Sequence, residues 1–240
     1  MKRLLSSALA VSALLGLVSV VAPSTALAKA DYSSFFWQRE LAGAGWAACE
    51  KPVTWSVDVR GLTSPQARRE IRRLEQAWGE WSAASGILVR FAGREDLVFD
   101  PGTNGLRRPN GSPQPDRHVY IALKTSKQVP LMTRGVVGLG MPSVVLLPTR
   151  EVVAGVAIFR RGFVLEQRKV EPDRVVHLYL HELGHVLGLG HAAHQDNVMY
   201  PSMDHRPTLG QGDVAGVKAM TQPCVRPLEA TRMAVTEPWE

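Results

Sequence analysis

The 240-residue sequence contains only two cysteines, Cys49 and Cys224, near the two ends of its central part. Neither lies near the histidine-rich stretch at residues 177–201, so they are not candidates for metal ligands or nucleophiles there. In an oxidising compartment they are expected to pair and close a loop of about 175 residues. Such a bond would join the two ends of the folded part of the chain.

Long apolar runs are absent after the first 30 residues, so the remaining chain offers no membrane-spanning segment. At the N-terminus a basic pair precedes an apolar run over residues 4–22, and two A-x-A cleavage patterns end at Ala28 and Ala30. This order predicts a secretory signal peptide over residues 1–30 and a secreted, extracellular mature protein. An uncleaved membrane anchor is the alternative, because the run approaches the length of a spanning helix.

The sequence also has only a small excess of positive charge. The net charge is +6, and it falls to +3 when Lys2, Arg3 and Lys29 of the predicted leader are removed. The arginines at residues 68–73 and 107–108 have no interleaved aromatic side chains, which argues against nucleic-acid binding. We interpret these clusters as solvated faces, with an acidic surface as the alternative partner. Hydrophobic residues make up 45% of the chain, which is typical of one globular domain.

The sequence does contain a dense group of histidines at residues 177–201. If this segment is helical through Gly188, His181 and His185 lie one turn apart on one face, where both imidazoles can bind one metal ion. Gly188 can adopt a left-handed conformation that ends the helix and brings His191 back as a third ligand. Three neutral imidazoles leave a fourth zinc position open, which is typical of a catalytic site.

A carboxylate and a methionine complete this pattern. Glu182 is too close in sequence to the two histidines to be a favourable third ligand of the same tetrahedral ion. It is well placed to accept a proton from metal-bound water as a general base. Met199 follows His191 by eight residues, in a run that can loop beneath the metal and form an apolar floor. The chain thus contains H-E-x-x-H-x-x-G-x-x-H followed by a methionine turn, which is the metzincin signature. Histidines that are merely packed or solvated are the alternative, and the matching positions of Gly188, His191 and Met199 argue against it.

The spacing from His191 to Met199, and the Met-Tyr-Pro sequence that follows, resemble the matrixins, the matrix metalloproteinase branch of the metzincins. The tyrosine ligand of astacins is absent, because Pro201 occupies that position. The resemblance implies a zinc metalloendopeptidase with one catalytic zinc, protein or peptide substrates, and no nucleic-acid or membrane partner. We expect a monomer. The alternatives are a secreted zinc-site binding protein without turnover, or a hydrolase of cell-wall or small peptides.

The resemblance also implies an α+β fold of the metzincin, zincin-like class over residues 49–224. Such a domain has a twisted mixed β-sheet with a long N-terminal helix, an active-site helix, and a C-terminal helix after the methionine turn. Residues 31–48 are then a short N-terminal arm whose aromatic side chains pack on the domain, and residues 225–240 are a tail. A binding platform is the alternative role for the aromatic side chains of the arm.

Sequence periodicity supports this order of elements. Alternating and apolar runs predict strands at residues 53–59, 87–91, 118–123 and 136–147. A helix from the N-cap Ser64 to Gly86 is expected to turn one apolar stripe toward the core, and the arginines and glutamates between the members of that stripe toward solvent. The stripe consists of Ile71, Leu74, Trp78 and Trp81.

The remaining segments complete the prediction. Residues 155–165 are a further strand or hairpin arm, and residues 166–173 a polar turn. The active-site helix begins near Pro172 or Asp173, with Val176, Leu180, Leu183 and Leu187 buried. Residues 208–220 resemble the last helix of a matrixin catalytic domain, with Val214, Val217 and Met220 inward. Residues 100–117 form a loop without regular structure. Calcium binding there, through Asp100 or Asp116, is less well supported than a plain surface loop.

By resemblance, an extended substrate pairs with the edge strand, and the segment after Met199 walls a hydrophobic pocket. The predicted cleft residues are Gly138, Leu139, Gly140, Met141, Tyr200, Pro201 and Met203. The chain departs from the matrixin pattern in lacking a pro-domain of the usual size, a P-R-C-G cysteine switch and a histidine cluster for a structural zinc. Met203 also replaces the usual wall tyrosine. We interpret His118 as isolated, His177 as packed or supporting His181, and His194 and His205 as surface or rim residues.

Overall fold

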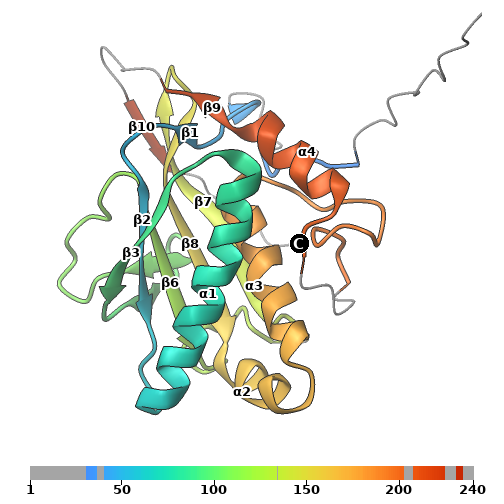
Figure 1. Ribbon diagram of the computed structural model, residues 1–240. Helices are drawn as coiled ribbons and strands as arrows, with labels where there is room; N and C mark the ends of the chain where they lie inside the picture. The colour runs from blue at the N-terminus through green and yellow to red at the C-terminus, as the bar shows by residue number, and fades with distance from the viewer. Residues whose placement is uncertain (1–30, 37–40, 134, 203–207, 225–230, 235–240) are drawn as a thin grey trace, which may run out of the picture.

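A mixed β-sheet forms the centre of the computed structural model, which describes residues 31–36, 41–133, 135–202, 208–224 and 231–234. The predicted leader, Met203 and His205 lie outside these ranges. The sheet has six strands in the order β10-β7-β8-β6-β2-β3. Helices α1 and α3 cover one face of it, and α2 lies at one end (Figure 1). This arrangement confirms the α+β, metzincin-like fold.

Four strands of the sheet pair in parallel, and only β7 runs in the opposite direction to its neighbours. The parallel strands are β2 (Val53–Asp58), β3 (Val89–Arg94), β6 (His118–Lys124) and β8 (Glu151–Arg160). The antiparallel pairs join β7 (Gly138–Leu147) to β8, and β10 (Thr231–Ala234) to β7. Strand β10 pairs only with the stretch of β7 from Val144 to Leu147. Among the described residues, the outer edge of β7 between Gly138 and Ser143 therefore has no strand beside it.

The helices are α1 (Ser64–Ser85), α2 (Arg161–Val170), α3 (Pro172–Val186) and α4 (Gln211–Met220). Helix α1 ends at Gly86, whose φ of 76° is left-handed, as predicted. Its N-cap is Thr63 instead of Ser64, and the backbone N–H of Thr63 donates to the side chain of Gln66 at 3.0 Å.

The predicted apolar stripe of α1 is buried, and one glutamate just before it is buried as well. Glu70 is fully buried and accepts hydrogen bonds from Arg73 at 2.9 Å and from the Tyr179 hydroxyl of α3 at 3.0 Å. A buried carboxylate is tolerated here because both contacts satisfy its charge and its lone pairs. Glu70 therefore joins α1 to the helix that carries the histidines.

Two other segments differ from their predictions. Residues 161–170 form helix α2, where we expected the end of a strand and a polar turn, because Val164 is fully buried and α2 packs against α3. Within the predicted loop at residues 100–117, β5 (Gly105–Arg107) pairs with β4 (Val98–Asp100) through the partly apolar run that includes the buried Leu106. In both cases tertiary packing overrides a polar or glycine-rich local sequence.

The sheet separates two apolar layers. The larger layer contains the tryptophans of α1, the inner side chains of β2 and most of α3. The smaller layer, on the other face, contains Tyr120, Leu139, Met141 and Ile158 under the segment around Val129. Leu139 and Met141, two predicted cleft residues, therefore point into this second layer. Only the backbone of β7 faces the edge where a substrate would pair.

The predicted disulfide between Cys49 and Cys224 is present. It lies beside a short parallel pair formed by β1 (Ala47–Ala48) and β9 (Gln222–Pro223). The arm packs on the domain as expected, because Phe36 and Trp46 are buried in the larger layer. The N-terminal and C-terminal segments are thus held together on one side of the molecule.

None of the helices in the described part of the chain combines the length and apolar character needed to cross a bilayer.

His118 belongs to a buried polar group that the sequence did not indicate. Its ring nitrogens lie 2.7 Å from the Thr54 hydroxyl and 3.0 Å from the Ser56 hydroxyl, and Ser56 donates to Glu95 at 2.7 Å. Burial lowers the pKa of His118 to about 4, while Glu95 acts in the opposite direction. The imidazole is therefore neutral in the folded protein at neutral pH.

This burial predicts an acid-dependent loss of stability. The unfolded chain binds a proton at His118 near pH 6.5, whereas the folded protein does so only near pH 4, so the free energy of unfolding falls as pH decreases between these values. The expected loss is about 1–3 kcal/mol. Urea unfolding of the zinc-free protein at pH 7 and pH 4.5 measures it, with His118→Gln as the reference. An equal pH dependence in both proteins would show that His118 does not contribute.

Candidate metal centre

Helix α3 places the predicted ligands. It begins at Pro172 as expected and carries His181, Glu182 and His185 in its last two turns. All residues from Val175 to Val186 are buried, because α1, α2 and β7 surround the helix. His177 is buried one turn before His181, with its ring stacked on the His181 ring at a centroid distance of 6.4 Å. It is a packed residue of the helix.

Gly188 reverses the chain after α3. Its φ of 98° lies in the left-handed region, as the sequence predicted. A side chain at this position would also approach the Phe36 ring to 3.3 Å. The turn returns the chain toward the helix, and His191 reaches the other two histidines from a loop.

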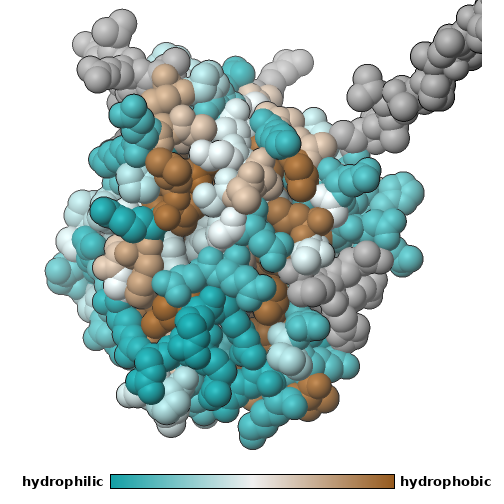
Figure 2. Space-filling model, viewed as in Figure 1, coloured by the Kyte–Doolittle hydropathy of each residue, from teal (hydrophilic) through white to brown (hydrophobic). Residues whose placement is uncertain are grey.

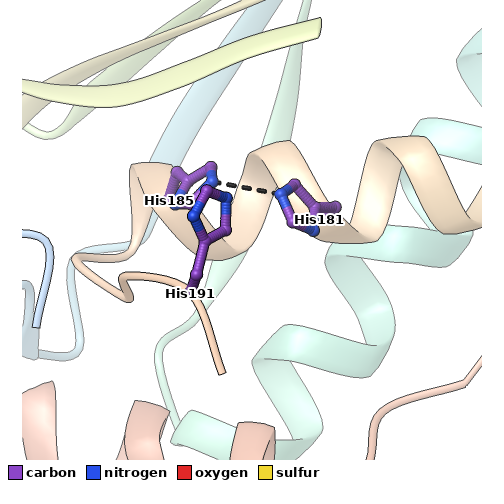
Figure 3. A group of neighbouring side chains, drawn as sticks. All are labelled: His181, His185 and His191. Atoms are coloured by element: carbon purple, nitrogen blue, oxygen red, sulfur yellow. Dashed lines mark hydrogen bonds between the residues drawn. The ribbon is translucent and has the colours of Figure 1, made fainter. Parts of the chain in front are cut away.

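The three imidazoles converge (Figure 3). One nitrogen from each of His181, His185 and His191 lies within 4.8 Å of the other two. The ring of His191 is 5.3 Å from that of His181 and 4.9 Å from that of His185, measured between centroids. Two of the rings are buried and His191 is exposed, so the group opens to solvent on one side.

The hydrogen bonds of the outer ring nitrogens indicate a metal site. The Nδ1 atoms of His181 and His185 lie 2.6 Å from the Val198 carbonyl and 2.7 Å from the Leu189 carbonyl, so both must donate. In neutral rings this leaves both Nε2 atoms as acceptors, yet they face each other at 3.1 Å. Two such lone pairs need a cation between them. Ligand nitrogens of a tetrahedral zinc lie roughly 3.3 Å apart, so these residues fit the ion.

The protonation states favour the same conclusion. Burial lowers the pKa of His185 to about 4 and holds that of His181 well below its ordinary value, with a further contribution from neighbouring histidines. Burial also lowers the pKa of His191. All three rings are therefore neutral near pH 7, which is the form that binds a metal.

Glu182 lies against the sheet, beside the histidines. Its side chain is buried, and burial raises the pKa of the carboxyl to about 8, although a hydrogen bond from the Gly140 backbone opposes the shift. Strand β7 can approach this closely only because it carries glycines. A Cβ at Gly138 would lie 2.3 Å from Oε1 of Glu182, and one at Gly140 would lie 2.0 Å from its carbonyl oxygen. These two predicted cleft residues therefore let β7 approach Glu182 closely, and the N–H of Gly140 contacts the carboxylate.

The methionine turn lies under the helix. Met199 is buried, and a Cβ at Gly184 would come within 2.2 Å of its sulfur, so glycine is needed where the turn meets α3. The turn is held by Asp213 of α4, whose carboxylate accepts the backbone N–H groups of Val198 at 2.7 Å and Met199 at 3.2 Å. Val198 in turn orients His181. Helix α4 thus supports the histidines through the turn.

Comparison with known proteins agrees with this geometry. Metalloendoproteinase 4-MMP of Arabidopsis thaliana is 28% identical to this chain over 173 residues, which are 70% of this chain and 45% of the plant protein. The chain thus spans less than half the length of that relative. Residues 160–221, from the end of β8 through α4, match the matrixin family of peptidases. The segment of this chain that carries the histidines is therefore similar to the matrixins. The matched segment includes all three histidines, Glu182 and Met199.

A groove of about 660 Å³ runs past the histidines of the matrixin-like domain. One wall is the apolar segment that leads into β7, and the floor is α3. Pro201 lines the groove as predicted, and Gly138 and Leu139 contribute to the β7 side. Tyr200 is partly exposed beside Pro201. Figure 2 shows apolar residues gathered in patches on one face of the molecule.

Several residues that support the site were missed in the sequence. Asp213 of α4 is one of them, and it is buried. Of the residues predicted to point inward from α4, Val217 is buried, whereas Val214 is only half-buried. Asn197 and Asp31 were also missed, although both hydrogen-bond around the loop that carries His191. All three act on backbone groups far away in sequence. Such contacts leave no periodic pattern, and the only signal was an aspartate in the first turn of a helix.

Proposed function

We propose that the protein is a zinc-dependent metalloendopeptidase that hydrolyses peptide bonds in proteins or peptides. The proposal is supported above all by the three neutral imidazoles, whose nitrogens lie within 4.8 Å of one another beside the buried Glu182. His181, His185 and His191 are the ligands of one zinc ion, and Glu182 is the general base. Met199 is the apolar floor below them.

The three histidines and Glu182 have different roles in the proposed reaction. Zinc bound to the three histidines would polarise the scissile carbonyl and lower the pKa of the attacking water. Glu182 accepts a proton from that water and then delivers it to the departing amine. Burial raises the pKa of this carboxyl to about 8 in the metal-free protein, and the positive charge of a bound zinc ion would lower it and keep the carboxylate ionised as a base. The backbone N–H of Gly140 orients it for both transfers.

The substrate binds as an extended strand along the outer edge of β7. Its backbone pairs with residues 138–141, where no described strand competes, and its side chains enter the groove lined by Leu131, Val137 and Leu178. The apolar lining favours a hydrophobic side chain near the scissile bond. Met203, the other residue predicted to wall the pocket, lies outside the described residues.

We place the mature protein outside the cell. Residues 1–30 have the pattern of a secretory signal peptide, and the disulfide between Cys49 and Cys224 suits an oxidising compartment. The enzyme acts there as a monomer with a single zinc ion.

Hydrolysis of a quenched peptide library, together with casein, by the zinc-loaded mature protein tests the function. We expect endoproteolytic cleavage by the wild-type protein and a loss of about 10²-fold or more in Glu182→Ala at unchanged zinc content. Equal activity in the two proteins would exclude Glu182 as the base. Zinc binding without any cleavage would favour a binding protein, and cleavage restricted to short or cell-wall peptides would narrow the substrate class.

A further inference from the structure

The loop that carries His191 has little regular structure of its own. Between the end of α3 at Val186 and the gap after residue 202, the described residues form no helix or strand. His191 is also the exposed member of the three histidines. Its position must therefore be fixed by contacts with other parts of the chain.

The N-terminal arm, residues 31–36, provides such contacts. The backbone N–H of Gly190 donates to the Ser33 carbonyl at 2.8 Å, and that of Phe35 donates to the Gly188 carbonyl at 2.8 Å. These bonds flank an antiparallel bridge between Ser34 and Leu189. The Ser33 hydroxyl then donates at 2.7 Å to the carbonyl of His191 itself.

Asp31 also binds the loop that carries His191. Its two carboxylate oxygens accept the backbone N–H groups of Ala193 at 2.9 Å and His194 at 2.8 Å. One of them also accepts the side-chain amide of Asn197 at 2.7 Å. Ser33 thus contacts the loop at Gly190 and His191, and Asp31 contacts it two and three residues after His191.

Asn197 extends this network to the methionine turn. Its side-chain oxygen accepts the backbone N–H groups of Gly212 at 2.8 Å and Asp213 at 3.2 Å, at the start of α4. The Asp213 carboxylate in turn holds the turn that carries Met199. One chain of hydrogen bonds therefore connects the N-terminal arm, the loop that carries His191 and the methionine turn that orients His181.

The surface that receives the arm is shaped by glycines. A Cβ would lie 2.4 Å from the Ser33 hydroxyl at Gly190, 2.2 Å from the Asp31 carbonyl at Gly212, and 2.8 Å from Cβ of Tyr32 at Gly216. A side chain at any of these positions would displace the arm. Three such close approaches indicate that this surface is a docking site for the N-terminal arm and is not merely covered by it.

We propose that Asp31 and Ser33 are positioning residues, which fix His191 for metal binding by anchoring its loop to the N-terminal arm. The expected effect on zinc affinity rests on the proposed function. Partners one step removed from a ligand typically change metal affinity by 10- to 100-fold. Both predicted signal-peptide cleavage sites precede Asp31, so the mature protein keeps the arm in either case.

The experiment compares zinc affinity in Asp31→Asn and Ser33→Ala with wild type, by competition with a chromophoric chelator. We expect the zinc dissociation constant to rise about 10-fold or more in Asp31→Asn and by a smaller factor in Ser33→Ala, with Ser33→Thr restoring the wild-type value. Asp100→Asn is the matched control, because Asp100 also accepts a backbone N–H, that of Gly102 at 3.0 Å, in the β4–β5 hairpin. Its zinc affinity should be unchanged.

Hydrogen exchange in the metal-free protein separates this inference from the proposed function. We expect the amides of Gly190, Ala193 and His194 to exchange faster in Asp31→Asn, while amides of the sheet keep their protection. Unchanged exchange at these amides, or a wild-type zinc dissociation constant in a wild-type protein that does bind zinc, would overturn the positioning role. If the wild-type protein binds no zinc, the proposed function fails and the exchange measurement still decides the role of Asp31.

Discussion

Replacement of His185 by alanine is expected to abolish both zinc binding and peptide hydrolysis. His185 supplies one of two Nε2 atoms that face each other at 3.1 Å, and its Nδ1 is already committed to the Leu189 carbonyl. The loss of zinc affinity should exceed the roughly 10- to 100-fold effect of removing an outer partner of a ligand. Chelator competition and initial rates on a quenched peptide measure the two effects.

The matched control for this change is His194→Ala. His194 is exposed and lies three residues after His191, but its ring is not part of the group of converging nitrogens. Zinc should raise the midpoint of thermal unfolding in wild type and in His194→Ala, because a ligand of the folded state stabilises it. The shift should vanish in His185→Ala. A shift of wild-type size in that variant would mean that the ion binds elsewhere.

Gly138→Ala is expected to lower kcat/KM by about 10²-fold while zinc stays bound, because a misplacement of about 1 Å in a reacting group has effects of this size. The added Cβ would lie 2.3 Å from Oε1 of Glu182, so the carboxylate must move. None of the three histidines is in this contact. The variant therefore separates the general base from the metal site, and zinc content and kcat/KM are the two measurements.

Gly79→Ala provides the control for Gly138→Ala. Gly79 lies in α1, and a Cβ there meets no atom within 4 Å. The same chemical change should leave kcat/KM unaltered, and it should stabilise the helix by about 0.5–1 kcal/mol. If Gly138→Ala also retained full activity, the carboxylate of Glu182 would not need its observed position, and its role as the base would be in doubt.

The convergence of the three histidines was predictable from the sequence because these residues are close together in it. His181 and His185 are one helical turn apart, and Gly188 had to turn the chain for His191 to return. Each of these features leaves a local signal, in spacing or in residue type. The long helix α1 was predictable for the same reason, since its apolar stripe repeats at helical spacing.

The supports of the site depend on contacts between distant segments, which no local pattern records. Asp31 reaches Ala193, and Asp213 reaches Val198, only because the fold brings the arm and α4 against the histidine loop. Helix α2 was missed because its sequence is mostly polar and its single fully buried residue, Val164, becomes apparent only once α3 lies beside it. Strand β7 was predicted as an edge strand, but the close approach of its glycines to Glu182 became apparent only in the structure.

Anomalous diffraction at the zinc edge from crystals of the mature, zinc-loaded protein tests the central claim most directly. We expect a single strong peak per chain, about 2.0–2.1 Å from one ring nitrogen of each of His181, His185 and His191. Glu182 should lie beside the ion without ligating it. No peak among the three imidazoles in a fully loaded protein, or a peak bound by other residues, would contradict the account.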